Sequence, residues 1–127
     1  MTPDTLDDAA ISFLTERHLA TLSLPRADGS IQVVAIAFTY LDGVVRIITR
    51  GGSVKARRLA AHPGLRATVC QVDGGRWLAL EGSAVVTDDP VRVALAVARY
   101  AERYRPPEDN PERVAIEIAV DRVTGRW

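Results

Sequence analysis

In the stretch TRGGSVKARRLAAH (residues 49–62), two glycines join a predicted strand to a short basic helix. The β-branched residues within 44–48 favour the strand, and Gly51-Gly52 end it. Ser53 is a good helix N-cap, because its hydroxyl accepts a hydrogen bond from an amide of the first turn. The other free amides of that turn and the helix dipole favour an anion at this end.

Lys55 lies in the first turn of this helix, and Arg58 follows three residues later on the same face. Lys55 is the only lysine in the chain, whereas the other fifteen of the sixteen basic residues are arginine. An ammonium and a guanidinium bind anions differently, so a lone lysine indicates a specific contact. The stretch therefore predicts a phosphate site. The alternative is a solvated basic helix after a glycine turn, since no Walker or dinucleotide spacing is present.

The composition indicates one globular domain over residues 1–127, with 47% hydrophobic residues. Sixteen acidic residues balance sixteen basic ones, which argues against a general binder of nucleic acid or of a membrane surface. Cys70 is the only cysteine and cannot form a disulfide within the chain, so we expect a reducing cytoplasm. No apolar run reaches the roughly 20 residues that span a bilayer, and the first residues do not resemble a signal peptide.

Hairpins dominate the predicted element order. Asp42-Gly43 and Asp73-Gly74-Gly75 are strong turn signals. A first helix is expected over 6–17, capped by Asp4 or Thr5, and the strands over 19–24, 31–41, 44–48, 65–72, 76–86 and 114–120. The strand 31–41 is apolar on both faces, so we expect it to lie centrally. Six strands with inserted helices predict a small antiparallel barrel, because a doubly wound sheet would alternate each strand with a helix.

A further helix is predicted to begin at Asp88-Asp89-Pro90 and to end before Pro106. Its apolar residues recur at helical spacing and are expected to face the core: Val91, Ala94, Leu95, Ala98 and Ala101. Arg92, Arg99 and Arg103 are expected on the opposite, solvated side. The helix is therefore predicted to be amphipathic.

Side chains for catalysis are scarce. His18 and His62 are far apart in sequence, and no group of His, Cys and Asp has metal-ligand spacing. Glu81-Gly82-Ser83 lacks the second glycine of a serine-hydrolase elbow. If the protein is an enzyme, we expect a cofactor to supply the reactivity, and no catalytic residue is assigned.

Short matches along nearly the whole chain resemble the split β-barrel flavin and deazaflavin oxidoreductases related to pyridoxamine 5′-phosphate oxidase. Among these enzymes, the branch that uses the deazaflavin coenzyme F420 and reduces biliverdin is the most similar. The matching segments are His18-Leu19-Ala20, Phe38-Thr39, Thr49 to Ala56, Gly64 to Val69, Cys70 to Gly74, Arg76-Trp77-Leu78, Leu80-Glu81-Gly82, Arg99-Tyr100-Ala101 and Arg103-Tyr104-Arg105. The resemblance implies a six-stranded antiparallel split β-barrel, the FMN-binding split-barrel fold, and a homodimer with its cofactor at the subunit interface.

The resemblance also implies roles for particular residues. The cofactor phosphate would be held by Thr49, Arg50, Ser53 and Lys55. Backbone groups of the segment Val34, Ala35 and Ile36 would meet the edge of the ring system. Ala35 departs from many relatives, which have proline at this position. Trp77 is expected either against the cofactor or bilin, or in core or interface packing.

Hydride transfer from reduced coenzyme F420 to an unsaturated, conjugated substrate is the implied reaction, with the tetrapyrrole biliverdin as the favoured substrate. Its propionates suit arginines, since a guanidinium bonds both carboxylate oxygens. Arg50, Arg58 and Arg76 are the candidates. Two alternatives remain open at this point: an FMN-dependent oxidase or reductase, and a non-catalytic dimer that binds flavin, haem or a bilin.

Overall fold

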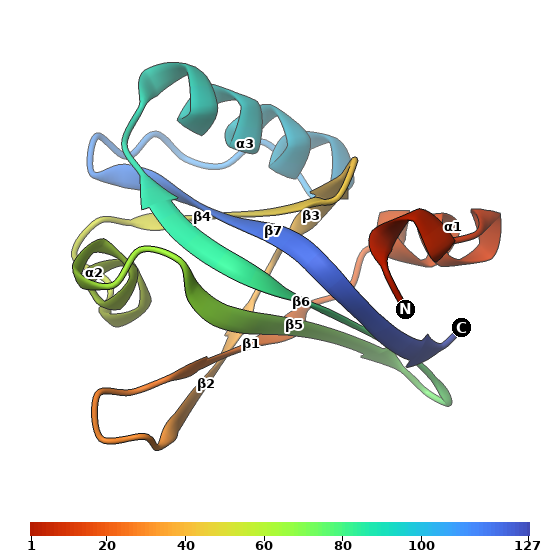
Figure 1. Ribbon diagram of the computed structural model, residues 1–127. Coiled ribbons are helices and arrows are strands. Elements are labelled where there is room, and N and C mark those ends of the chain that lie inside the picture. Colours follow the sequence, from red (N-terminus) through yellow and green to blue (C-terminus); the bar gives the residue numbers. More distant parts are fainter.

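The computed structural model describes all 127 residues, which form one antiparallel sheet with three α-helices and a 3-10 turn (Figure 1). The helical elements are η1 (Pro3–Thr5), α1 (Asp8–Thr15), α2 (Val54–Ala61) and α3 (Pro90–Arg103). The strands are β1 (Ala20–Pro25), β2 (Ile31–Ile36), β3 (Thr39–Leu41), β4 (Val44–Arg50), β5 (Leu65–Asp73), β6 (Arg76–Thr87) and β7 (Arg113–Arg126). Their order in the sheet is β2-β1-β5-β6-β7-β4-β3.

The predicted strand 31–41 is interrupted at Ala37-Phe38, so the sheet has seven strands where six were expected. β2 pairs with β1 at one edge of the sheet, and β3 pairs with β4 at the other. One continuous segment therefore supplies both edges, which curls the sheet into the expected split barrel. The prediction that this segment lies centrally was wrong: its apolar side chains include exposed Ile31 and Val33, at 56% and 57% of their surface.

The barrel interior holds a single cluster of 19 buried apolar residues. The strands contribute alternate residues, such as Val69 on β5 and Leu80 on β6, which follows from the two-residue period of a strand. Leu59 on α2 and Phe13 on α1 are buried in the same cluster, so these helices close the barrel.

The first helix begins later than predicted. Asp7, and not Asp4 or Thr5, is its N-cap: the Asp7 carboxylate accepts a hydrogen bond from the Ala10 amide at 2.9 Å. The same carboxylate accepts a bond from the indole of Trp127 at 2.8 Å, which ties the last residue of the chain to α1.

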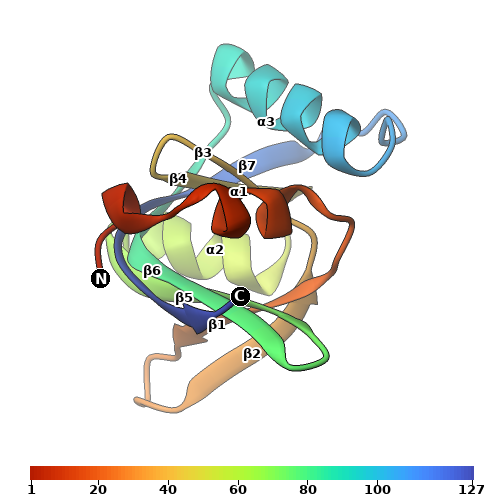
Figure 2. The same ribbon diagram turned by 90° about the vertical axis from the view of Figure 1, so that its right-hand side faces the viewer.

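α3 lies outside the barrel against β4 and β7, whereas β1 and β2 lie on the opposite side (Figures 1 and 2). Its orientation contradicts the prediction. Among its residues only Ala96 and Arg103 are buried, while Val91 is 77% exposed and Leu95 41%. The guanidinium of Arg103 is bonded inside by the backbone carbonyls of Glu16 and Phe38 and by the side-chain oxygen of Gln71, which outweighs the apolar pattern. None of the helices is long and apolar enough to cross a membrane.

Candidate functional site

The split of the barrel leaves two strand edges without neighbours. β3 pairs only with residues 44–46 of β4, so Ile47–Arg50 have no partner on that side. β2 pairs only with β1, so its second edge is also free. Free edges present backbone N–H and C=O groups that a ligand can bond.

Two hollows lie between these edges. One, of about 330 Å³, is lined by Ala35, Ile36 and Ala37 of the β2 side and by residues 47–50 of β4. The other, of about 500 Å³, is lined by Gln32, Val34, Ser53 and Val54. Both are also lined by Thr49, Arg50, Lys55 and Asn110, so together they form one continuous groove. The fold thus brings together seven of the eight residues predicted to bind the cofactor.

The predicted anion seat lies at the start of α2, where Ser53 is the N-cap as expected. The Ser53 hydroxyl accepts a hydrogen bond from the Ala56 amide at 3.2 Å and another from the Thr49 hydroxyl at 3.3 Å. Its own proton is then free to donate to a ligand. The amides of Val54 and Lys55 belong to the first turn, where a helix provides no acceptor. This end of the groove therefore offers several donors to a phosphate.

Three cations line the groove: Arg50, Lys55 and Arg113. None of them forms an ion pair with a carboxylate. By contrast, four arginines elsewhere do: Arg66, Arg76, Arg92 and Arg99. Arg113 donates only to the backbone carbonyl of Glu108, at 2.5 Å. Arg50 and Arg113 are direct partners across β4 and β7, an arrangement that costs stability because like charges face each other. An anion in the groove would offset this repulsion.

Burial, and after it the charge of Arg50, lowers the pKa of Lys55 below its ordinary 10.5. A bound anion stabilises the ammonium and raises this pKa again. We therefore expect the affinity for the phosphate-bearing coenzyme to be highest below the pKa of Lys55 in the free protein, and to fall as the pH rises through it. Titrations between about pH 7 and 10 measure this, and Lys55→Arg, which stays charged, is the control. The same alkaline loss in Lys55→Arg would assign the effect to another group.

Sequence patterns did not indicate Asn110, Tyr100 or Arg113, all of which line the groove. Asn110 lies in the loop between α3 and β7, and its side-chain oxygen accepts from the Glu112 amide at 2.9 Å. The amide nitrogen of Asn110 makes no such bond and is available to a ligand. The pairing of β4 with β7 identifies Arg113 as a groove residue, because it places Arg113 opposite Arg50. That pairing joins segments far apart in the chain, so no local sequence pattern reveals it.

Three predicted residues lie outside the groove. Arg58 donates to the carbonyl of Pro25 at 3.0 Å and so ties α2 to β1. Arg76 bonds both carboxylate oxygens of Glu16, at 2.9 and 3.0 Å, and its guanidinium lies 4.4 Å from the centre of the Phe13 ring. Trp77 lies on β6 with 37% of its surface exposed. In a single chain, none of the three contacts the groove.

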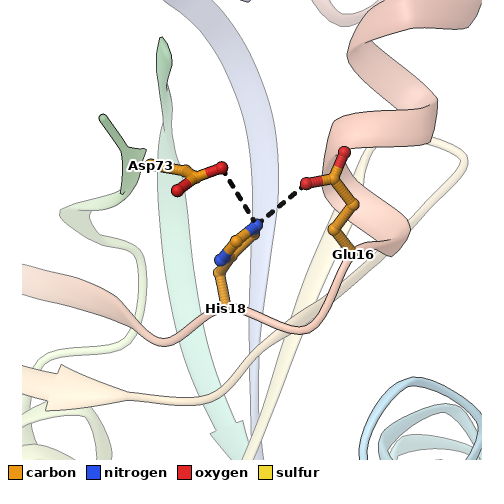
Figure 3. A group of neighbouring side chains, drawn as sticks. All are labelled: Glu16, His18 and Asp73. Atoms are coloured by element: carbon orange, nitrogen blue, oxygen red, sulfur yellow. Dashed lines mark hydrogen bonds and ion pairs between the residues drawn. The ribbon is translucent and has the colours of Figure 1, made fainter. Parts of the chain in front are cut away.

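The fold also gathers Glu16, His18 and Asp73, whose ligand atoms lie within 4.8 Å of one another (Figure 3). Sequence spacing gave no sign of this group. Nε2 of His18 lies 3.0 Å from Glu16 and 3.8 Å from Asp73. Arg76 bonds both carboxylates, and its hydrogen bonds, followed by that of His18, lower the pKa of Glu16 to about 2. The guanidinium already holds the oxygens a metal would need, so we interpret the group as an ion-pair cluster.

Several known proteins are similar to this chain in sequence or in fold. An F420H(2)-dependent biliverdin reductase from Mycobacterium tuberculosis is 52% identical over 122 residues, which are 94% of this chain and 88% of that protein. A solved structure described as an F420 reductase has a TM-score of 0.72 and 25% identity, covering 89% of this chain and 94% of that one. A conserved hypothetical protein from M. tuberculosis has a TM-score of 0.78 at 23% identity, covering 95% and 84%. The model of the pyridoxamine 5′-phosphate oxidase family matches residues 6–127, and the chain belongs to that family.

Proposed function

We propose that this protein is an oxidoreductase that transfers a hydride from reduced coenzyme F420 to biliverdin. The observation that carries the proposal is the groove between the two free strand edges, which is lined by three cations without carboxylate partners and has a helix N-terminus at one end. The relative at 52% identity, an F420H(2)-dependent biliverdin reductase, supports the choice of coenzyme and substrate.

The donor set of the groove fits such a coenzyme. Coenzyme F420 has a phosphate and a flat ring system with polar edges, and when bound it supplies the hydride. Lys55, Arg50 and the first-turn amides of α2 would hold the phosphate. The free edge of β2 at Val34–Ile36 would bond the polar edge of the ring, since these backbone groups have no partner strand. The chain's own part is to position the reactants and to stabilise charge, and reduction requires one further proton.

Turnover is the direct test of this proposal. Purified protein is mixed with reduced coenzyme F420 and biliverdin, and the oxidation of the coenzyme is followed by its absorbance together with the loss of biliverdin. We expect both to proceed in equal amounts, because one hydride and one proton reduce one substrate molecule. Coenzyme bound without consumption of biliverdin would instead favour a carrier, or a reductase with another conjugated substrate.

We also propose that two copies associate through the uncovered outer face of β2, β1, β5 and β6, here called the open face. It carries four exposed apolar side chains: Ile31, Val33, Val72 and Trp77. Register places them on one face. Val33 pairs with Ser23 across β2 and β1, and Ser23 pairs with Thr68 across β1 and β5. Val72 follows Thr68 by four residues and pairs with Trp77 across β5 and β6, so all of these side chains point the same way. Apolar side chains exposed on the face of a sheet, beside a free strand edge, favour association. A dimer is also the arrangement in which Trp77 can meet a cofactor.

Val33→Asp is expected to dissociate the dimer, since it places a charge among the exposed apolar side chains of the open face. Val91→Asp is the matched control, because Val91 is 77% exposed but lies on α3, away from this face. Light scattering or analytical ultracentrifugation measures the mass of each variant. A dimer that survives Val33→Asp but is lost in Val91→Asp would show that α3, and not the open face, mediates association.

A further inference from the structure

The interruption between β2 and β3 is held by a buried arginine. Ala37 and Phe38 belong to neither strand, so no sheet ladder fixes their backbone. The carbonyl of Phe38 instead accepts hydrogen bonds from Nη1 of Arg103, at 2.7 Å, and from the hydroxyl of Tyr104, at 3.1 Å. The Phe38 ring is 1% exposed and lies under the guanidinium, 4.7 Å from its centre.

Arg103 bonds two other segments as well. The Glu16 carbonyl accepts from Nε at 2.9 Å and from Nη2 at 2.6 Å, and the Gln71 side-chain oxygen accepts from Nη2 at 2.5 Å. Gln71 in turn donates to the carbonyl of Phe13 at 2.9 Å. Arg103 is buried, with 7% of its surface exposed. Its guanidinium thus joins α3 to the strand break, to the loop before β1 and to β5. Lysine cannot replace it, because an ammonium lacks the planar fork that reaches all three directions.

One residue of the strand break, Ala37, lines the groove, next to Ala35 and Ile36 at the end of β2. We infer that Arg103 is a positioning residue: through the Phe38 carbonyl it fixes the backbone of residues 36–38, and so sets where the ring system of the cofactor lies relative to the substrate. This inference rests on the proposed function. It separates two tasks in the groove, because Lys55 and Arg50 bind the phosphate end while Arg103 determines the geometry at the ring end.

Arg103→Lys tests the inference, since it keeps the positive charge and loses the fork. Arg99→Lys is the matched control: Arg99 lies one turn earlier on α3 and donates to the carbonyl of Tyr40 at 3.3 Å, but does not contact the break. Amide hydrogen exchange of residues 37–40 is measured without cofactor, and kcat and the coenzyme Kd are measured separately. In Arg103→Lys we expect faster exchange of the Thr39 amide, which shares a peptide bond with the Phe38 carbonyl and begins the ladder between β3 and β4. We also expect kcat to fall by about tenfold or more while Kd stays within about threefold. Arg99→Lys should match the parent protein.

Faster exchange with an unchanged kcat would overturn the inference, because Arg103 would then stabilise the break without affecting the reaction. Unchanged exchange would overturn it too. Should Arg103→Lys fail to fold, Tyr104→Phe removes the second donor to the Phe38 carbonyl, and the same shifts are expected at smaller size. If the parent protein itself neither binds nor uses coenzyme F420, the proposed function fails. The exchange result alone then decides whether Arg103 fixes the strand break.

Discussion

Replacing Gly82 with alanine is expected to lower the free energy of unfolding by more than about 3 kcal/mol. A Cβ atom at this position would lie 1.9 Å from the carbonyl oxygen of Ala119 and 2.6 Å from its carbonyl carbon. Both are backbone atoms of β7, so no side-chain rotation can relieve the clash. Gly82 lies at the register shift between β6 and β7.

Gly75→Ala is the matched control, because a Cβ there meets no atom within 4 Å and the residue does not have a positive φ. Its effect should stay within about 0.5 kcal/mol. Denaturant unfolding followed by circular dichroism measures both variants. Equal stability of Gly82→Ala and the parent would mean that β6 and β7 are further apart at the bulge than the structure places them.

Lys55→Ala is expected to weaken binding of coenzyme F420 by about 1–3 kcal/mol, which is roughly 5- to 150-fold in Kd. Lys55 has no carboxylate partner, so the variant breaks no ion pair of the fold, and its stability should change little. The loss in affinity then reports the contact with the phosphate.

Arg57→Ala is the control for Lys55→Ala. Arg57 is on the same helix, so its substitution also removes one positive charge, but Arg57 is exposed and lines neither hollow. Isothermal titration with the oxidised coenzyme compares the two variants. If they lost the same affinity, general attraction by the basic helix would explain the result, and Lys55 would have no specific contact.

Local signals predicted the turn between β3 and β4 and the N-cap of α2 well. Asp42-Gly43 turns the chain between β3 and β4, where Asp42 has a φ of 49° and Gly43 of 84°, and Ser53 caps α2. Both features depend on residues a few positions apart. The same holds for Lys55, whose place in the first turn follows from the cap.

The features that sequence patterns missed depend on residues far apart in the chain. The break at Ala37-Phe38 depends on Arg103, which lies 65 positions beyond Phe38. An arginine on a helix was assigned to solvent because burial of a charge requires acceptors that no local pattern reveals. Arg113 lies beside the groove because β7 pairs with β4, which places Arg113 opposite Arg50.

The cellular location, the absence of a nucleic-acid partner and two of the substrate contacts stay predictions. The cytoplasmic location inferred from a single cysteine and the lack of a nucleic-acid partner inferred from balanced charge both rest on the sequence. The predicted substrate contacts of Arg58 and Arg76 also stay predictions, and in one chain both guanidinium groups are engaged by other residues.

Parallel fluorescence titrations with oxidised coenzyme F420 and with FMN test most directly whether the groove is a deazaflavin site. Both ligands have a phosphate and a related ring, so the anion seat alone does not separate them. We predict that coenzyme F420 binds at least about tenfold more tightly than FMN, a difference of about 1.4 kcal/mol. Tighter binding of FMN would contradict the assignment and indicate a flavin oxidoreductase, and binding of neither would remove the proposed chemistry from this barrel.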